Sequence, residues 1–83
     1  MLAGELGDRP TIAMKQLDLG EIALAKGDLT RAITYIEESL CFFREQDDIP
    51  NIAAALGVLG DIKRIQGKLT EATALYNEAS FLK

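Results

Sequence analysis

One stretch of this chain occurs twice, forty positions apart. Residues 27–32 read Gly-Asp-Leu-Thr-Arg-Ala, and residues 67–72 read Gly-Lys-Leu-Thr-Glu-Ala (67 − 27 = 40). The same offset, applied without a gap, also pairs Pro10 with Pro50, Ile12-Ala13 with Ile52-Ala53, Leu19-Gly20 with Leu59-Gly60, and Ile22 with Ile62. A gapless set of matches at glycine, proline and apolar positions predicts two copies of one structural unit.

Each copy has the periodicity of two α-helices. Apolar residues recur at three- and four-residue spacing, and glycine or proline interrupts the pattern between segments. The expected helices cover residues 10–26, 29–46, 50–66 and 69–82. Asp8 and Asp28 stand where side chains cap the first two helices, and Gly27 and Gly67 stand where a left-handed residue ends a helix. No segment alternates apolar and polar residues long enough to form a strand. The predicted fold class is therefore all-α, with two stacked antiparallel helical hairpins.

The helical spacing also predicts which residues face inward. In the first helix these are Ile12, Leu19, Ile22 and Ala23, and in the second they are Leu29, Ala32, Ile33, Ile36, Leu40 and Phe43. In the third helix they are Ile52, Leu56, Leu59 and Ile62, and in the fourth they are Leu69, Ala72, Tyr76 and Ala79. A glycine inside a helix costs about 1 kcal/mol relative to alanine. Because Gly20 and Gly60 occupy equivalent positions, we expect them to allow close packing against the partner helices, at Ala32 and Ala72.

The chain is expected to form a single repeat domain over residues 1–83. Residues 9–48 would form the first repeat and residues 49–83 the second. Glu5 and Asp8 match Glu45 and Asp48, which end the first repeat, so residues 1–8 resemble the tail of an upstream helix. This match suggests a piece of a longer array. The alternative is a short natural protein with a frayed N-terminus.

The repeated positions carry a family resemblance. Each copy places Leu-Gly in its first helix, a turn glycine seven residues later and an alanine five residues further on. A bulky residue follows after four positions (Ile36, Tyr76) and a small residue after three more (Ser39, Ala79). This pattern resembles the tetratricopeptide repeat, and the period of forty is similar to its longer variant. The second helix of the first copy resembles the repeat arms of bacterial signal-transduction ATPases and transcription regulators.

The resemblance implies an α-solenoid fragment that acts as a scaffold or sensor arm. Family members bind extended or helical peptides on a concave face lined by the first helix of each repeat. Carried over by position, this face would contain Met14, Leu17, Glu21, Leu24 and Ala25 from the first copy, and Ala54, Gly57, Asp61, Arg64 and Ile65 from the second. Leu17 and Glu21 replace the Lys and Asn of the carboxylate-clamp subfamily, so a clamp is not expected. The alternative is that Leu17 and Leu24 pack against a neighbouring helix.

Composition excludes several other classes of function. The net charge of −4 disfavours nucleic acid and anionic membranes as partners. A chain with no histidine and one cysteine cannot assemble the usual zinc ligand sets or activate that thiol with an imidazole. We therefore expect no catalytic residue, no metal site and no cofactor, and we expect the partner to be a protein or peptide.

Three further features are expected to be structural. The acidic pairs Glu37-Glu38 and Asp47-Asp48 are expected to be solvated surface, because adjacent helical residues point in different directions. Cys41 is expected to be a buried or half-buried thiol. The longest apolar run, residues 52–60, is too short to span a bilayer, and the N-terminus lacks the pattern of a secretory signal. These features favour a cytoplasmic location.

Self-association is the alternative to peptide binding. A helical repeat buries its apolar face only against a neighbour, and terminal repeats normally carry a polar cap. The last helix is expected to leave Leu75, Ala79 and Leu82 open, and the first helix to leave Ile12, Leu19 and Ile22 partly open. Two such faces would allow homo-oligomers, either as a twofold dimer or as a head-to-tail stack.

Overall fold

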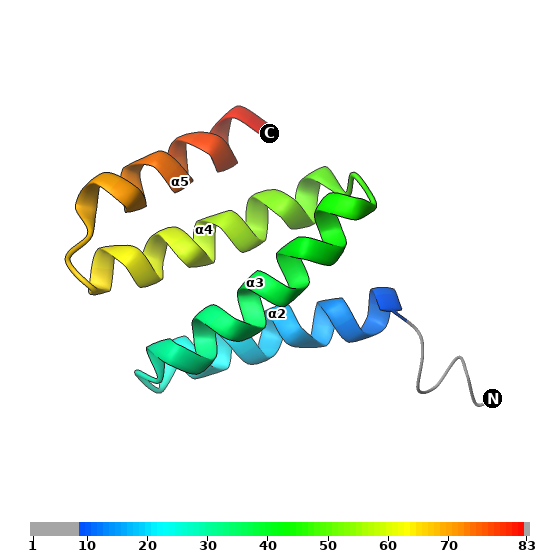
Figure 1. Cartoon of the computed structure of the whole chain (residues 1–83), viewed down its shortest axis with the longest axis horizontal. Coiled ribbons are helices and arrows are strands. Elements are labelled where there is room, and N and C mark those ends of the chain that lie inside the picture. The colour runs from blue at the N-terminus through cyan, green and yellow to red at the C-terminus, as the bar shows by residue number, and fades with distance from the viewer. Residues whose placement is uncertain (1–8, 83) are drawn as a thin grey trace.

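The computed structural model describes residues 9–82 and contains four helices in that part of the chain (Figure 1). They are α2 (Arg9–Ala25), α3 (Leu29–Glu45), α4 (Ile49–Ile65) and α5 (Leu69–Leu82), and no strand accompanies them within these residues. The all-α prediction is confirmed, and each observed boundary lies within one residue of the expected one. Asp8 and the expected upstream helix tail lie outside the described residues.

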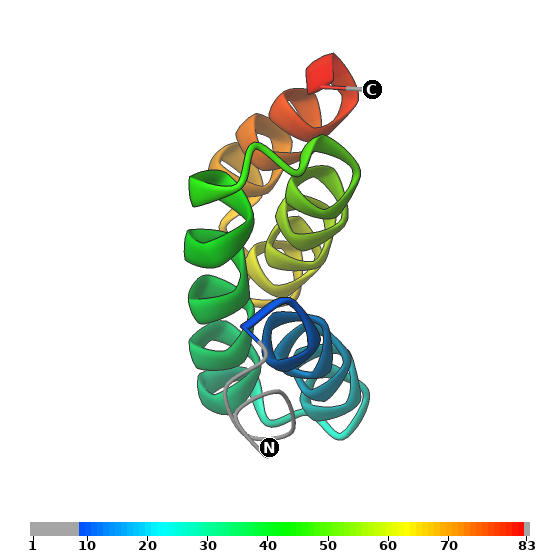
Figure 2. The ribbon, with the colours of Figure 1, turned by 90° about the vertical axis from the view of Figure 1, so that its right-hand side faces the viewer.

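The four helices form two antiparallel hairpins that stack on each other. Hairpin 1 pairs α2 with α3, hairpin 2 pairs α4 with α5, and the main contact between hairpins joins α3 to α4. Figure 2 shows α2 and α4 on one side of the molecule and α3 on the other. Equivalent helices begin forty residues apart, at Arg9 and Ile49 and again at Leu29 and Leu69. The sequence period is therefore also the period of the structure.

All three turns between helices have the same backbone design. Gly27 and Gly67 adopt φ values of 82° and 81°, as expected for left-handed residues that end α2 and α4. Asp47 occupies the same place between α3 and α4 and adopts a φ of 53°. In each turn the next amide donates to a carbonyl five residues back, as Asp48 does to Phe43 at 3.0 Å. The joint between hairpins thus uses a non-glycine residue in a left-handed conformation, which is uncommon.

Aspartate caps the helix that follows two of these turns. Asp28 is the N-cap of α3, as expected, and its carboxylate accepts a hydrogen bond from the Arg31 amide at 3.2 Å. Asp48 is the N-cap of α4 and accepts from the side-chain amide of Asn51 at 2.8 Å. The pair Asp47-Asp48, expected to be solvated surface, therefore builds the joint between the hairpins.

We expect Asp47→Gly to raise the free energy of unfolding by about 1 kcal/mol, because glycine adopts positive φ without the clash that a Cβ introduces. Thermal denaturation should then show a melting temperature higher by about 4–8 °C, the shift typical of 1 kcal/mol in a domain of this size. Gly27→Asp, the reverse change at the equivalent turn, is the matched control and should lower it. A lower melting temperature for Asp47→Gly would show that the aspartate side chain contributes more than its backbone conformation costs.

Helix α4 forms the centre of the core because it packs on α5 and also on α3. Its buried residues, at 0–6% exposure for the apolar side chains, are Ile52, Ala53, Ala55, Leu56, Leu59, Gly60 and Ile62. The buried residues of α5 are only Ala72 and Ala79. From hairpin 1 the core receives fully buried side chains of α3, among them Ile36 at 0% and Phe43 at 1% exposure. The inward residues predicted for the third helix are all confirmed.

The interior glycines make the expected close helix contacts, but against other residues than expected. A Cβ added to Gly20 would lie 2.6 Å from Cγ1 of Ile36, and one added to Gly60 would lie 2.7 Å from the ring of Tyr76. Ala32 contributes only its carbonyl oxygen, 3.4 Å from the Gly20 Cβ position. Each glycine therefore makes room for the bulky side chain of the facing helix.

Three of the four residues predicted to form a buried stripe on the first helix are exposed, which agrees with the expectation that the first helix leaves this face partly open. Ile12, Leu19 and Ile22 are 40%, 42% and 51% exposed. The residues of α2 that are buried are Ala13, Leu17, Gly20 and Ala23. The three exposed residues match Ile52, Leu59 and Ile62 of α4, which are buried. Residues with the same spacing are therefore buried on α4 of the second hairpin and exposed on α2 of the first.

The open face predicted for the last helix is wrong. Ala79 is 8% exposed, and Leu75 and Leu82 are partly buried against the core. The large apolar residues that α5 exposes are instead Leu69, which was expected to face inward, and Phe81, at 63% and 89% exposure. Side chains three, seven and ten residues after Ala72 thus face α4 or the core, whereas Leu69, in the first turn of α5, is exposed.

Candidate partner-binding surface

Helices α2 and α4 each expose part of the surface on which a partner was expected. On α2 these residues are Met14, Glu21 and Ala25, and Met14 is 42% exposed. On α4 the exposed residues are Ala54, Arg64 and Ile65, with Ile65 at 55%, while Gly57 and Asp61 are partly buried. Residues spaced as 14, 18, 21 and 25, or as 54, 58, 61 and 65, lie on one side of a helix. We call these two stripes the outer surface of α2 and α4.

Two of the predicted site residues face inward and do not belong to this surface. Leu17 is 5% exposed and lies in the core cluster, and Leu24 is partly buried against that cluster. The alternative interpretation, in which both leucines pack against a neighbouring helix, is therefore correct. Their counterparts on α4 are less covered, since Gly57 is partly buried and Arg64 is exposed.

A polar cluster that the sequence did not reveal joins α4 to α5 beside the outer surface. The Tyr76 hydroxyl donates a short hydrogen bond to the Asp61 carboxylate and accepts one from Nε of Arg64 at 3.3 Å. The Arg64 guanidinium also lies 3.8 Å from Asp61. The hydrogen bond to Tyr76 raises the pKa of Arg64 above its ordinary value. The sequence predicted Tyr76 only as a core residue. The equivalent residue of the first copy, Ile36, has no hydroxyl, and this difference was the one sequence feature that could have indicated the polar contact.

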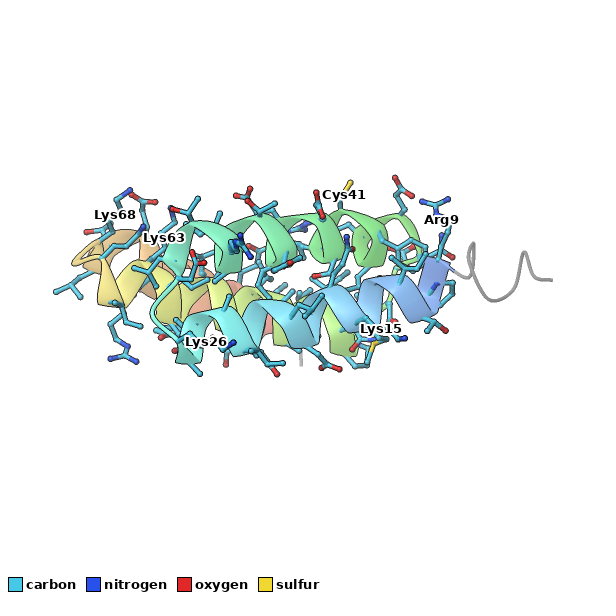
Figure 3. The ribbon with its side chains drawn as sticks, turned by 90° about the horizontal axis from the view of Figure 1, so that it is seen from below. Arg9, Lys15, Lys26, Cys41, Lys63 and Lys68 are labelled. Carbon is cyan, nitrogen blue, oxygen red and sulfur yellow. The ribbon has the colours of Figure 1, made fainter. Side chains whose placement is uncertain are left out.

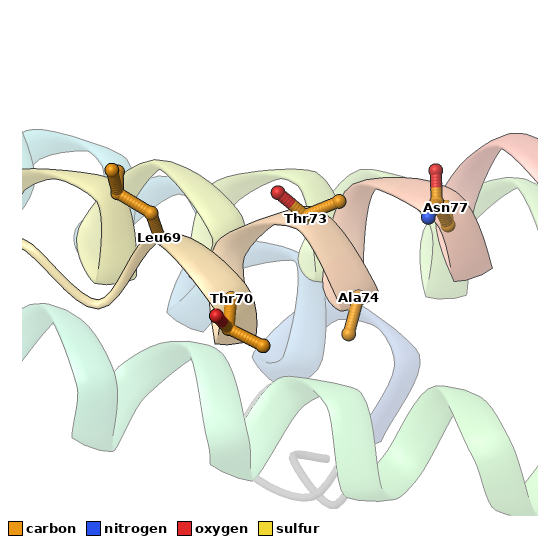
Figure 4. Close-up of a pocket in the computed structure, with 5 residues that line it drawn as sticks. All are labelled: Leu69, Thr70, Thr73, Ala74 and Asn77. Atoms are coloured by element: carbon orange, nitrogen blue, oxygen red, sulfur yellow. The ribbon is translucent and has the colours of Figure 1, made fainter.

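Two hollows of the described surface differ in their relation to the predicted site: one includes its residues Ala54 and Gly57, and the other lies outside it. One of about 390 Å³ lies between α4 and α5, lined by Pro50, Ala53, Ala54, Gly57, Tyr76, Ala79 and Ser80. Another, of about 400 Å³, lies along α5 alone, where Leu69, Thr70, Thr73, Ala74 and Asn77 point outward (Figure 4). Neither hollow is lined by a cluster of titratable side chains. Such surfaces suit contact with a protein better than enclosure of a small molecule.

The remaining candidates are accounted for by structure. Cys41 is exposed on α3, so the expected burial of its thiol is wrong. Glu38 accepts a hydrogen bond from the Gln16 side chain at 2.8 Å and thereby links α3 to α2. Among residues 9–82 no group of three potential ligand side chains is placed to hold a metal ion. In the same part of the chain, no helix combines the length and the apolar character that crossing a membrane requires.

Two stacked antiparallel helical hairpins have the architecture of helical-repeat proteins. The family model described as Tetratricopeptide repeat matches residues 11–80, which is most of the chain. The chain therefore belongs to the tetratricopeptide repeat family. Repeats of this family generally mediate protein–protein interaction and are typically not catalytic. No curated protein and no solved structure shows significant similarity to this chain.

Proposed function

We propose that this chain is a protein-interaction module that binds a peptide or helix across the outer surface of α2 and α4. The observation that carries the proposal is that the two helices lie side by side and that Met14 and Ile65 remain exposed on them. Met14 lies near the beginning of α2 and Ile65 ends α4, so a bound segment must extend about 16 Å along the two helices to contact both. The expected longer repeat variant, the division into repeats at residues 9–48 and 49–83, and a cytoplasmic location are parts of the same proposal.

Charge limits the partner that this surface accepts. Glu21 and Asp18 add carboxylates to the α2 stripe, and neither forms an ion pair with another described residue. On α4 the Asp61 carboxylate is already bonded to Tyr76. The preferred ligand is therefore a segment with apolar residues for Met14 and Ile65 and a basic residue for the acidic stripe, whose attraction should weaken with added salt.

Peptides selected against the full chain from a random display library test this proposal. We expect Met14→Asp and Ile65→Asp each to weaken binding of the selected peptides by about tenfold or more, since each removes an apolar contact of roughly 1.4 kcal/mol. Fluorescence anisotropy with labelled peptides measures the change in Kd. Both residues are well exposed, so the folded structure should be retained, as circular dichroism can verify.

Phe81→Asp is the matched control, because Phe81 is 89% exposed but lies on α5. Its Kd should equal that of the unmodified chain. If the selected peptides bind all three variants equally, the outer surface of α2 and α4 is not the binding site. If Phe81→Asp alone abolishes binding, the site lies on α5.

Self-association is the second candidate function. The exposure of Ile12, Leu19 and Ile22 favours it, because three large apolar side chains on one helix face are available to a second copy. The opposite end of the molecule favours it less. There Thr73 and Ser80 of α5 are exposed where α3 has Ile33 and Leu40, which pack against the core. A polar outer face of this kind suits a terminal repeat, so a head-to-tail stack would lack one apolar partner. Sedimentation at micromolar concentration distinguishes a monomer of 9.0 kDa from a dimer.

A further inference from the structure

One face of α2 stays open among residues 9–82. Positions 12, 15, 19 and 22 follow the helical spacing that places them on one side, and position 26 in the turn continues the row. This upstream face consists of Ile12, Lys15, Leu19, Ile22 and Lys26. Figure 3 views the molecule from the side where α2 lies and labels the two lysines, toward opposite ends of the helix. The upstream face is separate from the outer surface, which Met14 and Glu21 mark on the adjoining side of α2.

Helix α4 shows what covers such a face. At the matching positions, forty residues later, Ile52, Leu59 and Ile62 are 4%, 6% and 0% exposed. Both α2 and α4 have a partner within their own hairpin, so this partner does not explain the difference in burial. The difference comes from α3 of the preceding hairpin, which packs on α4 and has no counterpart on α2 within the described residues. The upstream face therefore has the shape to receive a helix packed as α3 is packed on α4.

Lys15 determines the chemistry of that helix. It stands where α4 has Ala55, whose exposure is 0%. A helix that covers α2 in the same way packs over Lys15 and reduces the hydration of its ammonium, which a carboxylate on that helix would offset. Neither Lys15 nor Lys26 forms an ion pair with another described residue. Asp28 lines the hollow that contains Leu19, Ile22 and Lys26, but its carboxylate is paired with Arg31. No acidic residue of the upstream face lies beside Lys15, so a carboxylate for Lys15 has to come from the partner.

We infer that the upstream face binds an amphipathic α-helix of a partner protein that carries a carboxylate opposite Lys15. The apolar stripe of that helix covers Ile12, Leu19 and Ile22, and a second acidic residue near its other end faces Lys26. A second copy of this chain fits this surface less well. Twofold pairing of two upstream faces brings lysines of both copies together and supplies no carboxylate to either, which is unfavourable.

The chain supplies the sequence of a probe for this surface. Helices α3 and α4 run antiparallel from the turn at residues 46–48. Leu40, seven residues before Asp47, therefore lies opposite Ala55, eight residues after it. A synthetic peptide of residues 28–46 imitates the helix that covers such a face. The same peptide with Leu40→Glu carries a carboxylate at the place that would face Lys15.

We expect the Leu40→Glu peptide to bind the full chain about tenfold more tightly than the unmodified peptide, because only the former pairs with Lys15. In the Lys15→Ala variant the order should reverse, since the site then resembles the one at Ala55, which faces a leucine. Fluorescence anisotropy of the two labelled peptides, titrated with each protein, measures the four affinities. Equal affinities of the two peptides for the unmodified chain would overturn the inference.

Two further variants locate the binding. Leu19→Asp changes an exposed residue in the middle of the upstream face and should abolish binding of both peptides. Met14→Asp, on the outer surface, should leave it unchanged, so failure of this inference is distinguishable from failure of the proposed function. Binding that survives Leu19→Asp would overturn the inference. So would a sedimenting dimer that Leu19→Asp dissociates, because the face would then belong to a second copy.

Discussion

Gly60→Leu should lower the free energy of unfolding by about 3 kcal/mol, because the new side chain has no room between α4 and α5. A Cβ alone would lie 2.7 Å from the Tyr76 ring, closer than carbon atoms approach in folded proteins. The ring cannot retreat freely, since its hydroxyl is held by Asp61 and Arg64. Urea denaturation followed by circular dichroism measures the loss. The urea concentration at the midpoint should fall, while the dependence of the unfolding free energy on urea concentration stays unchanged.

Gly57 provides the matched control for this change on the same helix. Nothing lies within 4 Å of a Cβ added at that position. Gly57→Leu should therefore cost little, and Gly57→Ala should raise the free energy of unfolding by up to about 1 kcal/mol through helix propensity. Equal losses for Gly60→Leu and Gly57→Leu would mean that the two faces of α4 are assigned incorrectly.

The second large effect concerns two leucines that occupy equivalent positions in the two hairpins. Leu59 is 6% exposed between the hairpins, and Leu19 is 42% exposed on the upstream face. Leu59→Asp should lower the free energy of unfolding by about 3–5 kcal/mol, because it buries an unpaired carboxylate and leaves a cavity. Leu19→Asp should lower it by less than about 1 kcal/mol, through helix propensity and a small loss of contact.

Thermal and urea denaturation of these two variants compare the effect of the same Leu→Asp substitution at an exposed and at a buried position. A total stability of about 5–15 kcal/mol is typical of small domains, so Leu59→Asp should unfold a measurable fraction of the chain at 25 °C. Leu59→Ala is a milder variant for the case in which Leu59→Asp does not fold. If Leu19→Asp destabilised the chain as much as Leu59→Asp, the upstream face would be covered in solution.

This pair of residues also explains which parts of the fold could be predicted. The helices, their turns and the stacking of two hairpins follow from local signals that repeat, such as Gly27 and Gly67, and they are confirmed. Burial depends on what lies next to a helix. Leu19 and Leu59 sit in the same local pattern, so periodicity alone could not show that only Leu59 is covered.

The candidate site was predicted less completely for the same reason. A helical position has neighbours on two sides in a stacked array, and the spacing of Leu17 and Leu24 fits a partner-facing stripe as well as an internal contact. The structure assigns both leucines to internal packing, whereas Met14, Glu21, Ala54 and Arg64 remain exposed. Tyr76 forms hydrogen bonds with Asp61, 15 positions away, and with Arg64, 12 positions away. No local sequence motif predicts contacts at these separations.

The position of α4 between α3 and α5 has a consequence for local unfolding. Separating the hairpins would expose one side of α4 to water, and opening the second hairpin would expose the other. The backbone amides of α4 therefore exchange with solvent only when most of the molecule opens, whereas α5, with two buried residues, opens at lower cost. Helix α4 therefore couples the folding of the two hairpins, while α5 is expected to open before the rest of the molecule.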